Sequence, residues 1–298
     1  MTAPAISPAQ QNEIDEIRNR IAALGVNFDN DTLAATQAIY RPLVAHQPKD
    51  GVTLTSDIAY GDHERQKLDV YRGTQASAPV LIYVPGGGFV GGDKSAAGEF
   101  YANVGTYFAR HGYLTVIPNY RLAPGAPWPA GAEDVGATVA WAKANAASHG
   151  GDPGKIFIWG QSAGATHVST YLFDDQFHPA GGPGITAAVL MSGPYKFEGA
   201  LRGNLVAYFG SDPALYPARS PLTHAGKSRV PLLLSVAQYD PDYLAAPTFE
   251  LAAAVTMRDG HAPAFAFMEG HNHVSTVQSI GSVQDDVGAK VRAFLAGF

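Results

Sequence analysis

The fold is decided by residues 155–164, which read Lys-Ile-Phe-Ile-Trp-Gly-Gln-Ser-Ala-Gly. The apolar run at 156–159 predicts a buried strand, which breaks into a tight turn carrying Ser162 and then into a helix over about 163–173. A serine at the tip of such a turn is held above the edge of a sheet, and the flanking glycines let other backbone approach it. The first N–H groups of the helix point at the same place. The stretch therefore combines an exposed nucleophile with a preformed anion site, as acyl transfer requires.

The rest of the chain supplies the context for this turn. The pentapeptide alone is weak evidence, because a chain with 33 glycines can produce it in an ordinary turn. Continuous apolar runs predict strands buried on both faces, and amphipathic stretches separate most of them. This alternation predicts an α/β protein with about eight mostly parallel strands, helices on both faces and an antiparallel first hairpin. The strands are expected at residues 52–60, 66–72, 79–84, 113–118, 156–159, 185–191, 231–237 and 263–268, and helices at 96–110, 132–147, 163–173, 243–258 and 280–296.

Two segments depart from this alternation and are expected to form a small cap over one edge of the sheet. Residues 8–47 hold two amphipathic helices before the first strand, the second with an N-cap at Asp31. Residues 194–228 are rich in Pro, Gly, Tyr and Phe and show no strand pattern. A long irregular insertion of this kind is often a lid. We therefore expect a single domain over residues 1–298, with its catalytic core at 51–298.

Composition excludes several classes of function. The chain has 46% hydrophobic and 15% charged residues and a formal charge of −6, which suits a folded core and argues against nucleic acid as a partner. It has no cysteine, so disulfides and thiol catalysis are excluded. No apolar run reaches the roughly 20 residues that cross a bilayer, and residues 1–8 lack the features of a signal peptide. We expect a cytoplasmic protein that binds no membrane; the oligomeric state stays open, with a homodimer as one outcome.

A serine becomes a good nucleophile only when a base takes its proton and a third group orients that base. Two later strands each end in candidates: one is followed by Asp240 and Asp242, and the next by His271 and His273. We assign Asp240 to a triad with Ser162 and His273, and Asp242 to capping the next helix. Asp242 and His271 remain the alternatives for the acid and the base. The non-catalytic interpretations are an Asp-Pro turn at residue 240 and two solvent-exposed loop histidines.

A second glycine-rich stretch, Pro85-Gly86-Gly87-Gly88-Phe89, follows the strand expected at 79–84. Consecutive glycines let backbone N–H groups face a ligand with no side chain in the way. We predict that the N–H groups of Gly87, Gly88 and Ala163 form an oxyanion hole, in which one donor can be worth roughly 100- to 1,000-fold in rate. The alternative is a flexible glycine-rich loop without a catalytic role.

Further motifs carry a resemblance to a known family. They span residues 80–275 and comprise Gly86-Gly87-Gly88-Phe89, Gly92-Asp93-Lys94, Asn119-Tyr120-Arg121-Leu122-Ala123-Pro124, Gly150-Gly151-Asp152-Pro153, Gly160-Gln161-Ser162-Ala163-Gly164, Ala237-Gln238-Tyr239-Asp240-Pro241 and Gly270-His271-Asn272-His273. Together they resemble α/β-hydrolases of the hormone-sensitive-lipase and carboxylesterase group, near the BD-FAE-like and kynurenine formamidase-like esterases. The resemblance implies an α/β-hydrolase fold, a Ser162–Asp240–His273 triad and ester hydrolysis without a cofactor. It also favours His273 over His271. One departure is Pro85, where the family usually has a histidine that holds the oxyanion loop.

These observations lead to one main hypothesis and two alternatives. The main one is a serine carboxylesterase for small or aromatic esters with a short acyl chain, which are its only expected partners. The alternatives are an arylformamidase or other amidase on the same triad, and a non-catalytic ligand receptor on the same fold. No metal is expected, because a histidine pair without a third ligand makes a poor site. The aromatic residues expected to line the substrate pocket are Phe28, Phe89, Tyr195 and Tyr208.

Overall fold

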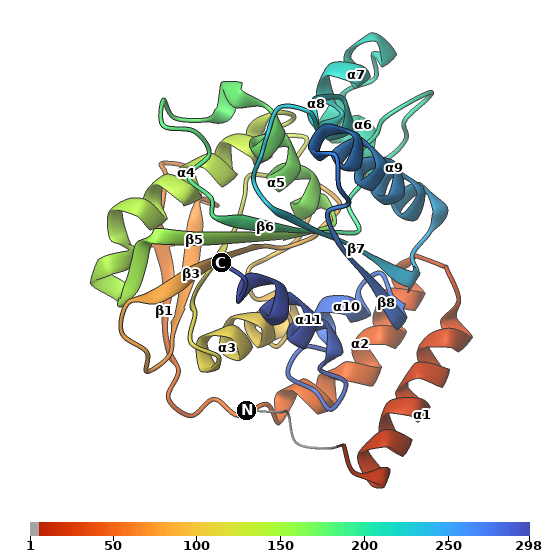
Figure 1. Cartoon of the computed structure of the whole chain (residues 1–298). Helices are drawn as coiled ribbons and strands as arrows, with labels where there is room; N and C mark the ends of the chain where they lie inside the picture. Colours follow the sequence, from red (N-terminus) through yellow and green to blue (C-terminus); the bar gives the residue numbers. More distant parts are fainter. Residues whose placement is uncertain (1–5) are drawn as a thin grey trace.

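The computed structural model describes residues 6–298, in which one sheet lies between two layers of helices (Figure 1). Residues 1–5 lie outside this range, and with them most of the stretch 1–8 in which no signal peptide is expected. The strands are β1 Thr53–Ala59, β2 Lys67–Arg72, β3 Ala78–Val84, β4 Leu114–Pro118, β5 Gly151–Gln161, β6 Ala187–Met191, β7 Leu232–Tyr239 and β8 Ala264–Asn272. The α-helices are α1 Pro8–Leu24, α2 Asn30–Ala45, α3 Ala102–Arg110, α4 Ala130–Asn145, α5 Ala163–Phe173, α6 Asn204–Phe209, α7 Tyr216–Arg219, α8 Pro221–His224, α9 Asp242–Asp259, α10 Ser275–Gln278 and α11 Asp286–Leu295.

The eight strands form a single sheet in the order β1-β2-β4-β3-β5-β6-β7-β8. Strand β2 is antiparallel to both β1 and β4, and every other pair is parallel, so β2 alone runs against the rest. The predicted mostly parallel eight-stranded sheet with a first hairpin is therefore confirmed. Strands β3 and β5 are neighbours, yet the chain leaves β3 toward β4 on one side and β5 toward β6 on the other. Their carboxyl ends mark the switch point at which open α/β sheets bind ligands.

The central strands are buried on both faces, as their continuous apolar runs predict. Successive side chains of a strand point to opposite faces. In β3, Val80 and Ile82 pack under α4, α5 and α9, whereas Leu81 and Tyr83 pack against α3 and α11. Figure 1 shows these two groups of helices on opposite sides of the sheet. Burying each such side chain stabilises the fold by roughly 1.5–3 kcal/mol, so the two packed layers hold the strand ends in fixed positions.

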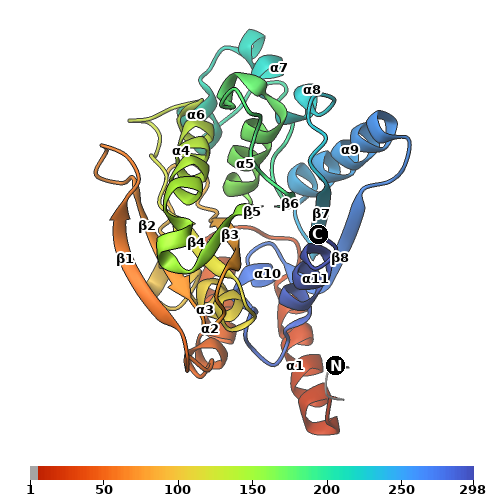
Figure 2. The same ribbon diagram turned by 60° about the vertical axis from the view of Figure 1, so that its left-hand side comes forward.

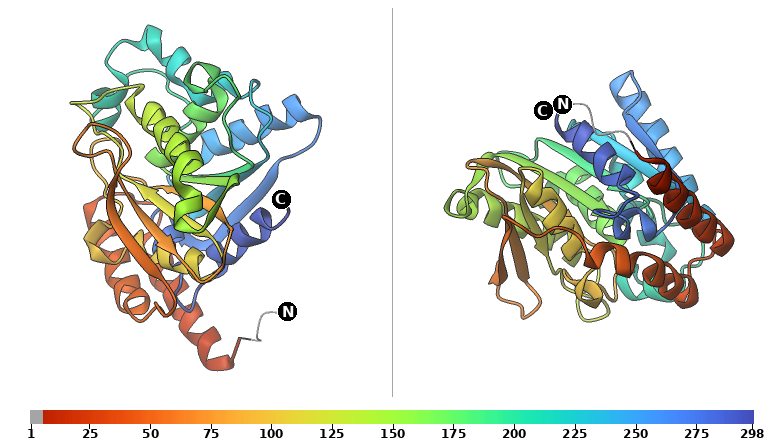
Figure 3. Two further views of the ribbon diagram at one scale, coloured as in Figure 1. Left: turned by 90° about the vertical axis from the view of Figure 1, so that its left-hand side faces the viewer. Right: turned by 90° about the horizontal axis from the view of Figure 1, so that it is seen from below.

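The N-terminal helices lie beside the C-terminal end of the chain. Helix α1 packs against β8 and α2 against α10 (Figure 3), and the Thr36 hydroxyl accepts a hydrogen bond from the Asn272 amide at 2.8 Å. The predicted N-cap of α2 is wrong by two residues. The cap is Asp29, whose carboxylate accepts from the Thr32 N–H at 2.8 Å, while Asp31 lies in the first turn, where its charge suits the helix dipole.

Residues 194–228 contain only short helices among loops and no strand, as their composition predicts. Helices α6, α7 and α8 lie on the same side of the sheet as α4, α5 and α9, away from α3 and α11 (Figure 2). The aromatic side chains of Phe197, Tyr208 and Phe209 form a buried cluster with Phe89, which follows β3. This cluster holds residues 194–228 against the glycine-rich loop that follows β3.

Candidate active site

Ser162 lies between β5 and α5 in a strained conformation that its neighbours impose. Its φ is 98°, in a region that residues other than glycine rarely adopt. A side chain at Gly160 would press on the backbone of α5, and one at Gly164 would collide with the carbonyl oxygen of Val84. The two glycines therefore allow β5, α5 and the end of β3 to meet closely, and the turn presents the serine hydroxyl at the sheet edge.

Three predicted residues form one chain of hydrogen bonds. The Ser162 Oγ lies 2.8 Å from His273 Nε2, and His273 Nδ1 lies 2.7 Å from Asp240 Oδ1. Because a carboxylate only accepts, Nδ1 donates to it, and Nε2 is left free to accept the serine proton. All three side chains are less than a tenth exposed. The arrangement can generate an alkoxide nucleophile and stabilise the imidazolium that results.

Asp240 is itself held by two donors. Its Oδ2 accepts from the Ser192 hydroxyl and from the Ala237 N–H, each at 2.6 Å. The backbone carbonyl of His273 accepts from the Gln161 amide at 3.0 Å, which ties the histidine loop to the end of β5. These contacts orient both the carboxylate and the imidazole toward Ser162.

The two alternative residues lie outside the hydrogen-bonded chain of Ser162, His273 and Asp240. Asp242 is exposed and is the first residue of α9, whose N-cap is Pro241, so the predicted capping role is wrong; its carboxylate accepts from the Tyr243 N–H at 2.7 Å. His271 is fully buried, 3.0 Å from both the Ser275 hydroxyl and Asp286. Burial acts to raise the pKa of Asp286, but the hydrogen bond and charge of His271, together with Lys290, bring it down to about 2. The interpretation of both residues as exposed loop histidines is therefore wrong, since His273 is buried as well.

The glycine-rich loop after β3 lies against the serine turn. A Cβ added to Gly86 would stand 3.1 Å from the Cβ of Ser162, so the loop can reach this position only with glycine there. Gly87 has φ 152° and Gly88 has φ 59°, conformations that glycine adopts readily. Gly88 and Ala163 line the same cavity as Ser162, whereas Gly87 is not part of that lining.

With proline at position 85, other contacts hold this loop. The Arg65 guanidinium donates to the carbonyl oxygens of Gly92 at 2.9 Å and Tyr120 at 3.0 Å. The Asn119 side chain accepts from the Lys94 N–H at 2.6 Å and donates to Asp93 at 2.9 Å. Sequence reasoning missed Arg65, because a lone arginine in a hairpin turn carries no motif. The loop is thus fixed from outside without an imidazole.

A cavity of about 290 Å³ opens beside Ser162. Phe28 and Phe89 line it, as predicted, and the Phe28 ring lies edge-on to the His273 ring with 4.5 Å between centroids. Phe28 comes from the loop between α1 and α2, so the N-terminal segment contributes to the site. The lining that no sequence pattern indicated comes from the 194–228 segment and α9, and comprises Pro194, Arg202, Asn204, Leu205, Tyr243 and Leu244.

Tyr195 and Tyr208 do not line this cavity. Tyr195 is fully buried in the core under α4, α5 and α9, and burial raises the pKa of its hydroxyl well above the usual value. Tyr208 stacks on Phe89, and its hydroxyl accepts from the Gly131 N–H at 3.0 Å. Tyr208 therefore lies behind Phe89 and supports the cavity wall there, whereas Tyr195 belongs to the core. His167 is buried beside Tyr208, and burial lowers its pKa to about 3, so it remains neutral.

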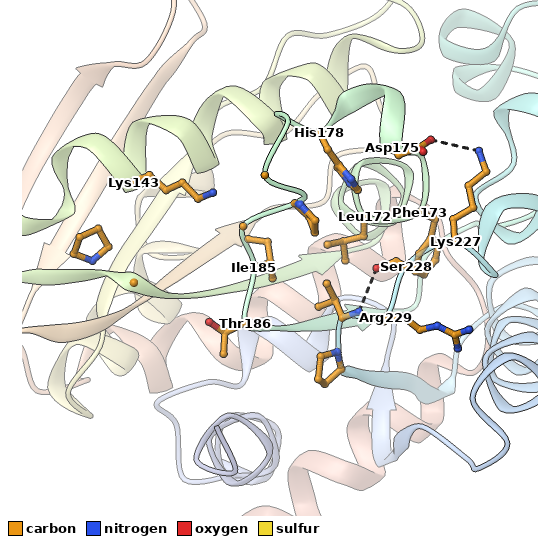
Figure 4. A pocket seen from close by; sticks show the side chains of 17 residues that line it. Lys143, Leu172, Phe173, Asp175, His178, Ile185, Thr186, Lys227, Ser228 and Arg229 are labelled. Carbon is orange, nitrogen blue, oxygen red and sulfur yellow. Dashed lines mark hydrogen bonds and ion pairs between the residues drawn. The ribbon is translucent and has the colours of Figure 1, made fainter.

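A larger hollow of about 710 Å³ lies at the opposite ends of β5, β6 and β7 (Figure 4). It is lined by basic side chains, two of which are paired: Lys227 with Asp175 at 3.6 Å, and Arg229 with Asp259 at 2.7 Å. It contains none of the predicted site residues. Within residues 6–298, no group of three or more His, Cys, Asp or Glu side chains could hold a metal ion, and no helix is both long and apolar enough to cross a membrane.

Solved structures with this architecture include esterases. Esterase B from Lactobacillus rhamnosis superimposes with a TM-score of 0.72 at 17% identity, over 98% of this chain and 96% of that one. An esterase from Pyrobaculum calidifontis gives 0.68 at 23% identity, over 99% and 97%. This chain has the α/β-hydrolase fold. The family model described as BD-FAE matches residues 68–172 of this chain, which include the glycine-rich loop and the serine turn.

Among curated proteins, this chain is similar to esterases of the type that its motifs predict. Esterase LipQ of Mycobacterium tuberculosis is 30% identical over 239 residues, which are 72% of this chain and 55% of LipQ. The chain thus spans about half the length of this relative, and smaller shares of other curated relatives that it matches. The predicted resemblance to esterases of the hormone-sensitive-lipase and carboxylesterase group is confirmed.

Proposed function

We propose that this α/β-hydrolase is a serine carboxylesterase, of class EC 3.1.1, that acts on small or aromatic esters with a short acyl chain. The observation that carries the proposal is the hydrogen-bonded chain from Ser162 through His273 to Asp240 at the switch point of the sheet. Relatives named as esterases support the same reaction, which needs no cofactor. They do not favour the amidase or receptor alternatives. A cytoplasmic location is part of this proposal, since a chain without cysteine suits a reducing compartment.

The proposed mechanism follows from the donors and acceptors of the site. The Ser162 hydroxyl attacks the ester carbonyl carbon as its proton passes to His273 Nε2, and Asp240 stabilises the imidazolium. The N–H groups of Gly87, Gly88 and Ala163 are proposed to bind the negative oxygen of the tetrahedral intermediate. His273 then gives its proton to the leaving alcohol, which departs and leaves an acyl group on Ser162. A water molecule, deprotonated by the same histidine, releases the acid.

The size and lining of the cavity support small substrates. Its volume of about 290 Å³ equals that of roughly ten liquid water molecules. Most of its lining is apolar or aromatic, and two of its rings, Phe28 and Tyr243, are about half exposed. An aromatic alcohol or acyl group can stack on these rings. Since Phe28 and Arg202–Leu205 come from the segments 8–47 and 194–228, we propose that these segments act as the cap.

The test is hydrolysis of p-nitrophenyl acetate, butyrate and octanoate by the wild type and by Ser162→Ala at neutral pH. We expect kcat to fall about a thousandfold or more in the variant, with the short esters preferred by the wild type. Ser148→Ala, at an exposed serine far from the cavity lining, is the matched control and should retain wild-type rates. Comparable rates in Ser162→Ala and the wild type would refute serine catalysis.

A further inference from the structure

The cavity beside Ser162 has one charged side chain in its lining, Arg202. Within residues 6–298, no carboxylate lies within 4 Å of its guanidinium, which also makes no hydrogen bond. The contrast with Lys196, in the same segment, is direct. Lys196 pairs with Glu198 and with Glu250, both at 3.0 Å. Two nearby carboxylates are therefore engaged with Lys196, and Arg202 has no ion-pair partner among the described residues.

A second polar group lies in the same lining. The Asn204 amide nitrogen is 2.9 Å from the point where a Cβ on Gly88 would stand, so this side chain packs onto the glycine-rich loop. Asn204 makes no side-chain hydrogen bond with the described residues, and no carboxylate lines the cavity. The remainder of the lining offers the Ser162 hydroxyl and mostly apolar or aromatic surface. A bound ester would thus meet the Arg202 guanidinium and the Asn204 amide, which can both donate hydrogen bonds and of which the guanidinium is a permanent cation.

The position of this cation is informative because the chain as a whole is acidic. With a formal charge of −6, the general field of the protein disfavours anions. A guanidinium presents five N–H donors in a fixed planar fork that matches a carboxylate. An arginine in the wall of a small cavity, with no protein carboxylate paired to it, can therefore compensate one negative charge on a ligand.

We propose that Arg202, with Asn204 beside it, selects esters that carry a carboxylate on their acyl or alcohol half. This inference rests on the proposed esterase function and adds a substrate class to it. The carboxylate forms a charge-assisted hydrogen bond with the guanidinium while the ester carbonyl lies at Ser162. Because Arg202 is exposed to solvent, we expect its contribution to kcat/KM to be about three- to fivefold, as for a well-formed surface ion pair.

The experiment compares two pairs of substrates in which a carboxylate is replaced by an isopropyl group of similar shape. The first pair is the 4-nitrophenyl monoester of adipic acid and 4-nitrophenyl 6-methylheptanoate. Adipate is chosen because the carboxylate of a shorter diacid attacks its own ester. The second pair is 4-acetoxybenzoate and 4-isopropylphenyl acetate, which place the charge on the alcohol half. For each pair, the ratio of kcat/KM for the anionic ester to that for the neutral ester is measured.

We expect Arg202→Gln to lower this ratio about three- to fivefold for at least one pair, and Arg202→Glu to lower it further. Sodium chloride at 0.5 M should reduce the ratio in the wild type, because salt screens the pairing. Lys143→Gln removes the same charge at the far end of the sheet and should leave the ratio unchanged. If the wild type cleaves the neutral esters but neither Arg202 variant changes the ratio for either pair, this inference is overturned while the proposed esterase function stands. If the wild type cleaves no ester of either pair and none of the p-nitrophenyl esters, the proposed function itself has failed.

Discussion

Replacing Asp240 by asparagine tests the proposed triad most directly, because the surroundings of this side chain decide how the amide must lie. The backbone N–H of Ala237 donates to Asp240 Oδ2 and cannot become an acceptor. The amide oxygen therefore stays on that side, and its NH₂ group faces His273 Nδ1. That nitrogen must then accept, so the proton moves to Nε2. An imidazole protonated at Nε2 can donate to Ser162 but cannot take its proton.

The size of the effect follows from the cost of the opposite orientation. Turning the amide over leaves the buried Ala237 N–H and one amide N–H without acceptors, at about 1–3 kcal/mol each. The productive form is therefore disfavoured by about 2–6 kcal/mol, and the negative charge that stabilises the imidazolium is lost as well. We expect kcat on p-nitrophenyl butyrate to fall about 10³- to 10⁴-fold with little change in KM.

The matched control is Asp242→Asn, two residues away. Its carboxylate is exposed and accepts only from the Tyr243 N–H, so rates within about twofold of the wild type are expected. Thermal unfolding followed by circular dichroism verifies that both variants are folded. An Asp240→Asn enzyme within tenfold of the wild type would refute the tautomer argument, and a large loss in Asp242→Asn would identify that residue as the acid instead.

Three further changes test the loop and the fold. Gly88→Ala should lower kcat on p-nitrophenyl butyrate about 100-fold, because its φ is 59° and its Cβ would press on a neighbouring amide; Gly226→Ala, in open space, should not. Lys94→Ala should lower the unfolding free energy in urea by about 3 kcal/mol, since it leaves the buried Asp69 carboxylate unpaired; a loss below 1 kcal/mol would contradict this. Burial raises the pKa of Asp285 from 3.8 to about 6, so its contribution to stability is complete below pH 3.8 and lost by pH 6 to 7. Asp285→Asn should therefore gain about 2 kcal/mol relative to the wild type between pH 4 and pH 7, and an equal difference at both pH values would count against it.

The sheet could be predicted because its strands carry an unambiguous pattern. Runs such as 79–84 are apolar at every position, which only a strand covered on both faces explains. Helix boundaries were less accurate where glycine or a strained residue interrupts the pattern. The helix predicted at 96–110 begins at Ala102, after positive φ values at Gly98 and Tyr101, and the one predicted at 280–296 begins at Asp286, after Gly281. The period of apolar residues in the sequence continues across such residues, but the helix does not.

The three residues of the hydrogen-bonded chain could be proposed because each follows a strand, and parallel strands bring their carboxyl ends to one edge. The walls of the cavity could not be proposed in this way. Arg202 and Asn204 lie in an irregular segment, where no period says which side chain faces inward. Tyr195 and Tyr208 are aromatic and lie in the correct segment, yet both turn toward the core. The catalytic roles of Ser162, Asp240 and His273, and those of the oxyanion donors, stay predictions.

The attachment of the N-terminal helices to the histidine loop has a consequence for heat inactivation. Thr36 is bonded to Asn272, and Phe28 covers the His273 ring, but neither α1 nor α2 contributes a strand to the sheet. Local opening of these helices therefore exposes and loosens the histidine while the sheet stays intact, and local opening requires less free energy than global unfolding. Activity should accordingly vanish at a lower temperature than secondary structure. Early, reversible inactivation would then be a property of α1 and α2, residues 8–45.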